Sequence, residues 1–492
     1  MQPFEMDFLR WCAKNRLLLG VVGLVGVFQL ATITPGLVNN EDACLFLSHA
    51  RNLATGRPYG ATDFIYTTET AIYSPSVYPP VFPTMLAPVY RFSGLNPNPY
   101  KILLVCTLLL SLIVIARLYR DRATRSQLLV VVALLGFSPF IAEQKNEIMS
   151  DLPFLLFVYA VLLLCSTLWE REAKGSPYLW PGIYVGLLSY LAYGTRSIGV
   201  GLIPCIIAFG MIRYRRIARF SLVAAGVFAA LAGLQSWFVS SSSDYLRMAI
   251  WDPHAAARNL RFYVGTTAYL WDAGAGASPR LVIFGIATGL FLVGAYRSVR
   301  EPLELATLFS LGYGLFLIFW PQHQAHYILP ILPVYMYLVV RGLFAVWDSI
   351  GRRWATARTV AAGAAAGILL LTYAGKYRTF HFGPNPDAWD SAAAVQLYEF
   401  VRDATPRNAV FIAGGPRALA LYTGRRSARF PDGIDRESRE SLTKYAAKVG
   451  ATYLVASRLD SNQWVIWCKS LGATEPVFSN SSYTVYRASA VK

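Results

Sequence analysis

Asn40-Glu41-Asp42-Ala43 opens a polar segment, from about Pro35 to Asn98, that lies between the first two apolar runs of membrane length. The segment continues as Ser48-His49-Ala50-Arg51-Asn52-Leu53-Ala54-Thr55-Gly56 and closes around Tyr78-Pro79-Pro80-Val81-Phe82-Pro83. Two carboxylates at the exit of a transmembrane helix are costly unless they face water or a partner. Glu41 and Asp42 are therefore the first candidates for a functional site.

The composition is that of an integral membrane protein. Of the 492 residues, 55% are hydrophobic and only 15% are charged, against roughly 25% charged in soluble domains. The formal net charge of +17 would suggest a nucleic-acid partner in a soluble protein. Here the basic residues concentrate in short loops between apolar runs, which is the distribution that sets membrane topology. This argues against nucleic-acid binding.

Apolar runs of membrane length predict about eleven transmembrane helices, since one crossing takes about 20 apolar residues. Under one assignment the arginine-rich loops all fall in the cytoplasm, and residues 35–100, 241–280 and the C-terminal tail fall on the opposite face. The active face is thus expected to point outward. The candidate spans are 17–34, 101–117, 127–142, 152–168, 179–195, 197–212, 220–240, 281–297, 303–321, 326–342 and 359–375.

The pattern changes near Gly383, where hydropathy falls. Helices are predicted at 389–403 and 438–449, and strands at 409–413, 452–456 and 482–486. We therefore expect a transmembrane domain over 1–380, with residues 35–100 as its external loop, followed by a small soluble extracytoplasmic α/β domain over 381–492. The Gly414-Gly415-Pro416 turn is too weak a pattern to indicate a nucleotide loop, and no catalytic role is assigned to this domain.

The order of motifs in the 35–98 segment resembles the first external loop of the C-fold (GT-C) glycosyltransferases, the protein O-mannosyltransferase and lipid A aminoarabinose transferase superfamily. There a carboxylate pair is followed by an "A-R-N-L-x-x-G" helix and a "P-P-x-x-P" turn. The resemblance covers most of residues 15–375 and implies a GT-C-like helical membrane fold. Tyr78 stands where the aminoarabinose branch usually has Lys, which argues against close kinship with that transferase.

This resemblance implies an enzyme of the bacterial inner (plasma) membrane with its active site on the extracytoplasmic face. It would transfer a sugar, with inversion, from a polyprenyl-phosphate carrier to a lipid, polysaccharide or protein acceptor. Hexosyl and pentosyl transfer both fit, and the sequence names neither the sugar nor the acceptor. No cofactor is firmly expected.

Inverting transfer needs a base for the acceptor hydroxyl, and a water-facing carboxylate can serve. By register with the family's "D-E-A" motif, Glu41 matches the catalytic Asp, whereas by residue type Asp42 is favoured, so both stay candidates. In the alternative reading, Asp42 only caps a helix that begins at Ala43.

A second motif, residues 143–153, resembles the family's second external loop. Glu147 and Asp151 are four apart and are expected to share a helix face, where they could contact acceptor or donor or hold a divalent cation. The alternative is that Ser150 or Asp151 caps the following helix.

Basic residues supply candidate phosphate contacts. Arg196 interrupts two apolar runs beside Gly194, and a buried guanidinium can grip a phosphate with two hydrogen bonds, although it could also snorkel to a lipid headgroup. His326-Tyr327 resembles the start of the family's "R-Y-x-L-P-x-x-P", with His in the usual place of Arg. His323 and His326 could ligate a metal, but no third ligand is near in sequence. Arg258 and Arg261 lie among aromatic residues, which suits an interfacial helix that binds lipid phosphate.

The main alternative class is a transporter or flippase of lipid-linked glycans. Such proteins carry internal repeats with matching broken helices, and we find no such symmetry here. A non-catalytic scaffold would not need carboxylates at two outer helix boundaries.

Overall fold

The computed structural model describes residues 11, 13–38, 40–67, 77–239, 253–320, 322–350, 363, 367, 371–431, 439–460, 462–471 and 475–488. The chain divides into two compact units. The first, the helical unit, comprises Met1–Ile33, Lys101–Gln235 and Leu246–His381. The second, the sheet unit, comprises Thr34–Tyr100, Ser236–Tyr245 and Phe382–Lys492.

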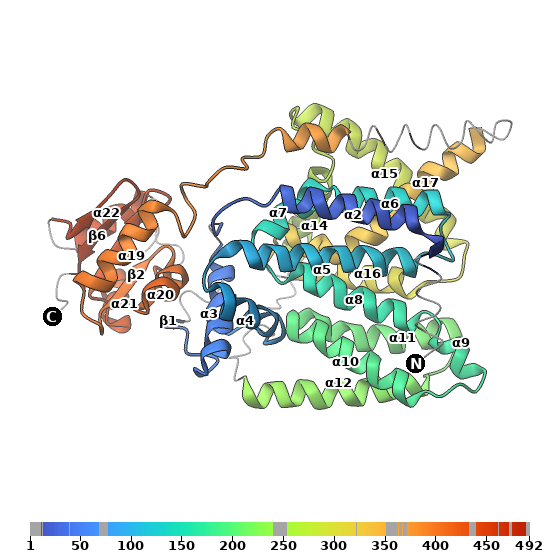
Figure 1. The fold of residues 1–492 in the computed structure, drawn as a ribbon, viewed down its shortest axis with the longest axis horizontal. Helices are drawn as coiled ribbons and strands as arrows, with labels where there is room; N and C mark the ends of the chain where they lie inside the picture. The colour runs from blue at the N-terminus through green and yellow to red at the C-terminus, as the bar shows by residue number, and fades with distance from the viewer. Residues whose placement is uncertain are drawn as a thin grey trace. The chain divides into compact units, whose positions relative to one another are not determined.

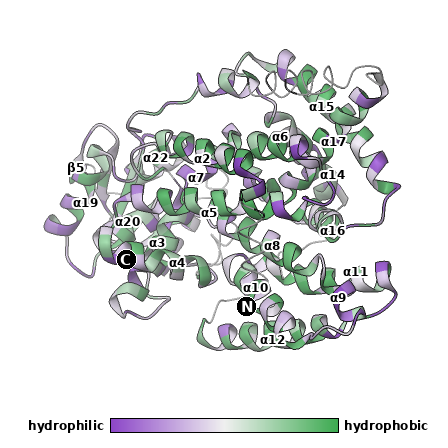
Figure 2. Cartoon of the chain, turned by 45° about the vertical axis from the view of Figure 1, so that its right-hand side comes forward, coloured by the Kyte–Doolittle hydropathy of each residue, from purple (hydrophilic) through white to green (hydrophobic). Residues whose placement is uncertain are grey.

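The helical unit contains several long apolar helices (Figures 1 and 2), and in these the hydrophobic residues run along most of the helix. Its elements are α2 (Arg16–Ala31), α5 (Pro97–Leu118), α6 (Arg125–Gly136), α7 (Pro139–Asn146), α8 (Asp151–Cys165), α9 (Leu168–Ala173), α10 (Leu179–Thr195), the 3₁₀ helix η2 (Ser197–Gly201), α11 (Leu202–Tyr214), α12 (Arg219–Phe238), α14 (Pro253–Tyr269), α15 (Ala277–Val299), α16 (Leu305–Phe319), the 3₁₀ helix η3 (Ala325–Ile331) and α17 (Leu332–Ile350).

Local sequence sets several of the helix ends. Thr124 and Gln127 form a reciprocal capping box that starts α6.

Close packing of α15 on α17 depends on two glycines. A Cβ on Gly294 would lie 2.0 Å from the carbonyl oxygen of Leu338, and a Cβ on Gly342 would lie 1.8 Å from the carbonyl oxygen of Leu290. Small residues at such crossings let apolar helices approach within backbone contact.

The expected eleven spans are not confirmed. Within the described residues, six helices are long and apolar enough to cross a bilayer, or seven if α6 and α7, bent by 46°, form one span. The predicted spans at 17–34 and 303–321 fold as the shorter helices α2 and α16, and 179–195 folds as the 17-residue α10. The predicted span 359–375 lies largely outside the described residues. The predicted break after Gly194 is present, since α10 ends at Thr195.

The sheet unit holds a six-stranded sheet in the order β1-β3-β2-β4-β6-β5. The strands β1, β3, β2 and β4 are parallel, and β6 and β5 are antiparallel to their neighbours. Its elements are α3 (Glu41–Thr55), β1 (Phe64–Ile65), α4 (Val81–Ser93), α19 (Ala392–Ala404), β2 (Val410–Ala413), α20 (Pro416–Thr423), β3 (Arg426–Arg429), α21 (Arg439–Val449), β4 (Tyr453–Ser457), α22 (Asn462–Leu471), β5 (Phe478–Ser479) and β6 (Tyr483–Arg487).

Five of the predicted segments, the two helices and three strands, coincide with α19, α21, β2, β4 and β6. The strands β1, β3 and β5 were not predicted. Of these, β1 comes from the polar segment before α4 and pairs with β3 through Phe64 and Ile65. The polar segment 34–100 and residues 382–492 thus fold as one compact unit.

Two apolar clusters cover the two faces of this sheet. One holds Ile412, Leu454 and Tyr486 with Trp464 of α22. The other holds Phe411, Val455, Tyr483 and Val485 with side chains of α19. Because successive strand residues point to opposite faces, neighbours in β2, β4 and β6 divide between the clusters.

Candidate functional site

Glu41 is engaged as a cap for a helix far away in the sequence. Its Oε2 accepts a hydrogen bond from the backbone N–H of Arg417 at 3.0 Å, and its Oε1 accepts one from that of Ala418 at 3.4 Å. These are free N–H groups of the first turn of α20, whose positive end favours a carboxylate. Desolvation raises the pKa of Glu41 to about 6 although Arg417 opposes this shift.

Asp42 is left free of any capping role. Helix α3 begins at Glu41, and its cap is Asn40, whose side-chain oxygen accepts from the Asp42 N–H at 3.0 Å. The alternative in which Asp42 caps a helix starting at Ala43 is therefore wrong. The Asp42 Oδ1 forms an ion pair with Arg417 Nη1 at 2.8 Å, and the Asp42 side chain is 31% exposed while that of Arg417 is only 5% exposed.

Arg417 is the functional candidate that sequence reasoning missed. It follows Gly414-Gly415-Pro416 in a stretch with no motif, 375 positions from its partner Asp42. Its guanidinium also lies 4.9 Å from the centre of the Phe64 ring. Only the folded chain, in which α20 packs on α3, brings this residue to the carboxylate pair.

We expect Glu41→Gln to reduce the pH dependence of stability. The folded pKa of about 6 exceeds the ordinary 4.5, so the proton on Glu41 stabilises the fold below pH 4.5, and this contribution is lost as pH rises through 6. Between pH 5 and pH 7 the free energy of unfolding of the wild type should fall by about 1 kcal/mol more than that of the variant. Thermal unfolding of both proteins across this range measures the difference. Parallel curves would contradict the desolvated carboxylate described here.

In the helical unit a second cluster of predicted site residues lies where three elements meet. Asp151 is the first residue of α8, Arg196 follows the end of α10, and Tyr327 belongs to η3. Arg196 Nη1 lies 2.6 Å from Asp151 Oδ1, and the guanidinium lies 5.0 Å from the centre of the Tyr327 ring. Asp151 is buried, and its Oδ2 accepts no hydrogen bond from the described residues.

The other predicted site residues are Glu147, His326, Arg258 and Arg261. Helix α7 ends at Asn146 with Glu147 as its C-cap, and the helical backbone is interrupted before α8 by Ile148 at a φ of 52°. Glu147 and Asp151 therefore do not share one helix face, and that prediction is wrong. The His326 ring packs edge-on against Tyr327, 4.8 Å between centres. Arg258 and Arg261 are exposed on α14.

In the described part of the chain, no three His, Cys, Asp or Glu side chains are grouped so that they could hold a metal ion. Ser150 makes no side-chain capping bond to α8. Of the two residues that could cap α8, Ser150 and Asp151, only Asp151 in the first turn remains a candidate.

No family model and no curated protein matches the sequence. Solved structures do match. ArnT from Cupriavidus metallidurans in the apo state superposes with a TM-score of 0.61 at 13% identity, over 96% of this chain and 98% of that one. The archaeal oligosaccharyltransferase AglB from Archaeoglobus fulgidus gives 0.59 at 14% identity, over 91% and 70%. The arabinofuranosyltransferase AftD from Mycobacteria gives 0.55 at 12% identity, over 97% and 40%.

These three neighbours are GT-C glycosyltransferases. At this level of identity the likeness establishes the fold, and the chain has the fold of the GT-C glycosyltransferases. The resemblance inferred from the 35–98 segment is thus confirmed for the architecture.

Proposed function

We propose that this chain is an integral membrane glycosyltransferase that moves one sugar from a polyprenyl-phosphate carrier to an extracytoplasmic hydroxyl acceptor, with inversion. The fold supports this proposal, and so do the molecules bound to its neighbours. ArnT has been solved bound to undecaprenyl phosphate, and AglB in complex with an inhibitory peptide and a dolichol-phosphate. The acceptor is a lipid, a polysaccharide or a protein.

The proposal rests on the different contacts that the Glu41 and Asp42 carboxylates make. Both oxygens of Glu41 are engaged by backbone N–H groups, whereas Asp42 is partly exposed and held by a single ion pair on Oδ1. A base must reach the proton it removes and must be held in one orientation. Asp42 meets both requirements, so we assign it as the base and Glu41 as a positioning residue.

The reaction then balances as follows. The acceptor oxygen bonds to the anomeric carbon of the sugar, while the bond from that carbon to the phosphate oxygen breaks. The acceptor proton passes to Asp42, and the polyprenyl phosphate leaves with the bonding electron pair. Arg417 fixes Oδ1 and leaves Oδ2 for the proton. Attack opposite the leaving phosphate inverts the anomeric configuration.

Arg196 is the proposed contact for the donor phosphate. Its guanidinium can form bidentate hydrogen bonds to phosphate oxygens, and the ion pair with Asp151 together with Tyr327 holds it in position. His326 supplements this contact, Glu147 is assigned to substrate orientation, and the exposed Arg258 and Arg261 are assigned to lipid phosphate.

The proposal requires the 35–100 segment to face away from the cytoplasm. We expect alkaline phosphatase fused after Gly94 to be active, because the arginine-rich loops on the other side favour the cytoplasm. Green fluorescent protein at the same position should stay dark. Fluorescence there, with an inactive phosphatase fusion, would reverse the topology and remove access to an outward-facing donor.

A further inference from the structure

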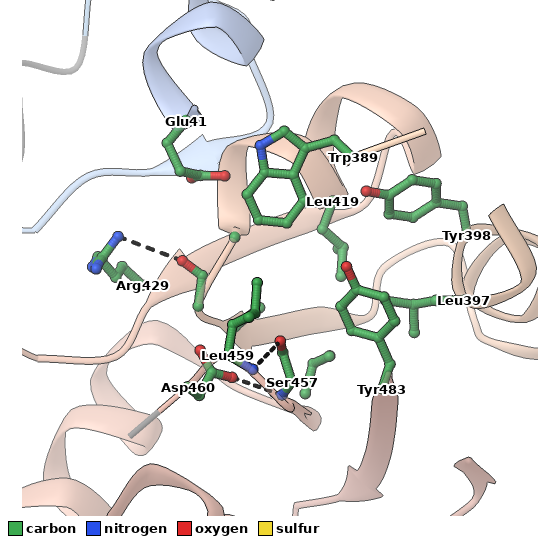
Figure 3. Close-up of a pocket in the computed structure, with 14 residues that line it drawn as sticks. Glu41, Trp389, Leu397, Tyr398, Leu419, Arg429, Ser457, Leu459, Asp460 and Tyr483 are labelled. Atoms are coloured by element: carbon green, nitrogen blue, oxygen red, sulfur yellow. Dashed lines mark hydrogen bonds between the residues drawn. The ribbon is translucent and has the colours of Figure 1, made fainter. Parts of the chain in front are cut away.

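A pocket of about 270 Å³ opens in the sheet unit at the carboxyl ends of its parallel strands (Figure 3). Gly414 and Gly415 follow β2, and Ser457 ends β4. Glu41 and Trp389 line the pocket from outside the sheet. Asp42, the proposed base, is not among the lining residues.

The strand order places this pocket where ligands bind in open parallel sheets. From β2 the chain goes through α20 to β3 on one side, and then through α21 to β4 on the other side of β2. Such a reversal leaves a crevice outside the carboxyl ends of the two central strands. The pocket lies at that crevice between β2 and β4.

The usual occupant of such a crevice, a phosphate, is excluded by the local chemistry. Phosphate would bind the free N–H groups at the start of α20, but Glu41 already occupies those of Arg417 and Ala418, and Pro416 has none. Asp460 adds a second carboxyl. Desolvation raises the pKa of Asp460 and that of Glu41 to about 6, so both carry charge at pH 7. Arg429 offsets only one of these charges.

The rest of the lining combines aromatic faces with hydrogen-bonding groups. The Trp389 Nε1 is buried and has no hydrogen-bond partner among the described residues. The hydroxyls of Tyr398 and Tyr483 point toward the middle of the pocket, and Ser457 and Asp460 lie at its far end from Trp389 (Figure 3). A ligand with several hydroxyls and apolar C–H faces satisfies both kinds of surface.

Two glycines are needed to shape the pocket. A Cβ on Gly414 would lie 2.1 Å from Asp460 Oδ1, and a Cβ on Gly415 would lie 2.2 Å from the Trp389 ring. The volume of about 270 Å³ lies just below the roughly 300–1,000 Å³ of sites for drug-sized ligands. This size suits one six-membered or five-membered sugar ring.

We propose that this pocket binds a single uncharged sugar ring of a glycan. The ring would pack on Trp389 and exchange hydrogen bonds with the Trp389 N–H, the two tyrosine hydroxyls and the carboxylates. Because Glu41 lines the pocket and also caps α20, a bound ring would contact the residue next to Asp42. The binding itself does not depend on the transferase proposal.

The test uses the full chain in lipid nanodiscs and saturation-transfer NMR. The probes are the methyl glycosides of glucose, galactose, mannose, arabinose and N-acetylglucosamine, which represent a ring within a glycan. The corresponding sugar 1-phosphates represent a ring delivered with its phosphate. We expect at least one methyl glycoside to bind and its 1-phosphate to bind at least tenfold more weakly. Failure of every methyl glycoside at millimolar concentration, or tighter binding of a 1-phosphate, would overturn the proposal.

Substitutions in the pocket test whether the sugar binds there. Trp389→Phe combined with Tyr483→Phe keeps an aromatic side chain at both positions but removes two hydrogen-bond donors, so the dissociation constant should rise about tenfold or more. Tyr486→Phe is the matched control, because Tyr486 lies in the same strand but belongs to the apolar cluster on the other face. Equal affinity in the wild type, the double variant and Tyr486→Phe would overturn the assignment to this pocket.

Sugar binding should persist in Asp42→Asn. Loss of binding there would place the ring at the transfer site instead.

Discussion

Asp42→Asn is expected to lower turnover by about 10²–10⁴-fold, the usual contribution of a well-placed base. The amide keeps the size of the side chain and can accept a hydrogen bond from Arg417 through its oxygen, but it cannot take the proton of the acceptor. Insertion and folding should be preserved. Release of polyprenyl phosphate by purified protein, measured at saturating donor, reports the loss.

Glu41→Gln is the matched control for this variant. It changes the neighbouring carboxyl by the same chemistry, but both oxygens of Glu41 accept from backbone N–H groups of α20 and Glu41 is not the proposed base, so turnover should stay within about tenfold of wild type. The reverse ranking, with Glu41→Gln the more damaging change, would make Glu41 the base. Near wild-type rates in both variants would remove the acidic pair from the chemistry.

Loss of the positive charge at Arg196 is the second large expected effect. Simple truncation would leave Asp151 buried and unpaired, which costs about 3–5 kcal/mol of stability. The informative variant is therefore Arg196→Gln combined with Asp151→Asn, which keeps a hydrogen bond between two neutral amides. If Arg196 grips the donor phosphate, this variant should fold but raise the KM for donor about 30-fold or more, equivalent to about 2 kcal/mol.

The single variant Asp151→Asn tests the effect of the negative charge beside Arg196 while leaving the size of the side chain unchanged. It removes the carboxylate that neutralises Arg196 and keeps the guanidinium, so donor KM should be unchanged or lower than in wild type. Arg196→Lys should retain part of the affinity, because it keeps a point charge without the bidentate fork. A double amide variant with wild-type donor KM would remove Arg196 from the phosphate site.

Composition, long apolar runs and the placement of charge in the sequence predicted the helical membrane class, and the ordered motifs of residues 35–98 predicted the GT-C fold. The predicted number of spans is not confirmed within the described residues, because length and hydropathy do not show where a helix bends. The run at 127–142 is an example, since it splits into α6 and α7 with a 46° bend. The spacing of Glu147 and Asp151 was misread for the same reason, because the helix breaks between them.

The choice between Glu41 and Asp42 could not be made from the sequence. It depends on α20, which lies some 375 positions away and supplies both the N–H groups that occupy Glu41 and the guanidinium that holds Asp42. The same holds for β1, two residues of a polar loop that add a strand to a distant sheet. Long-range pairings of this kind leave no local periodicity in a single sequence.

The central claim is that this chain consumes a polyprenyl-phosphate sugar through Asp42. Mass spectrometry of membrane lipids from a strain that lacks the chain tests this most directly. We predict that one polyprenyl-phosphate sugar accumulates, that the wild-type chain clears it, and that an equally expressed Asp42→Asn chain does not. Unchanged polyprenyl-phosphate sugars in the deletion strain, or full clearance by Asp42→Asn, would contradict the claim.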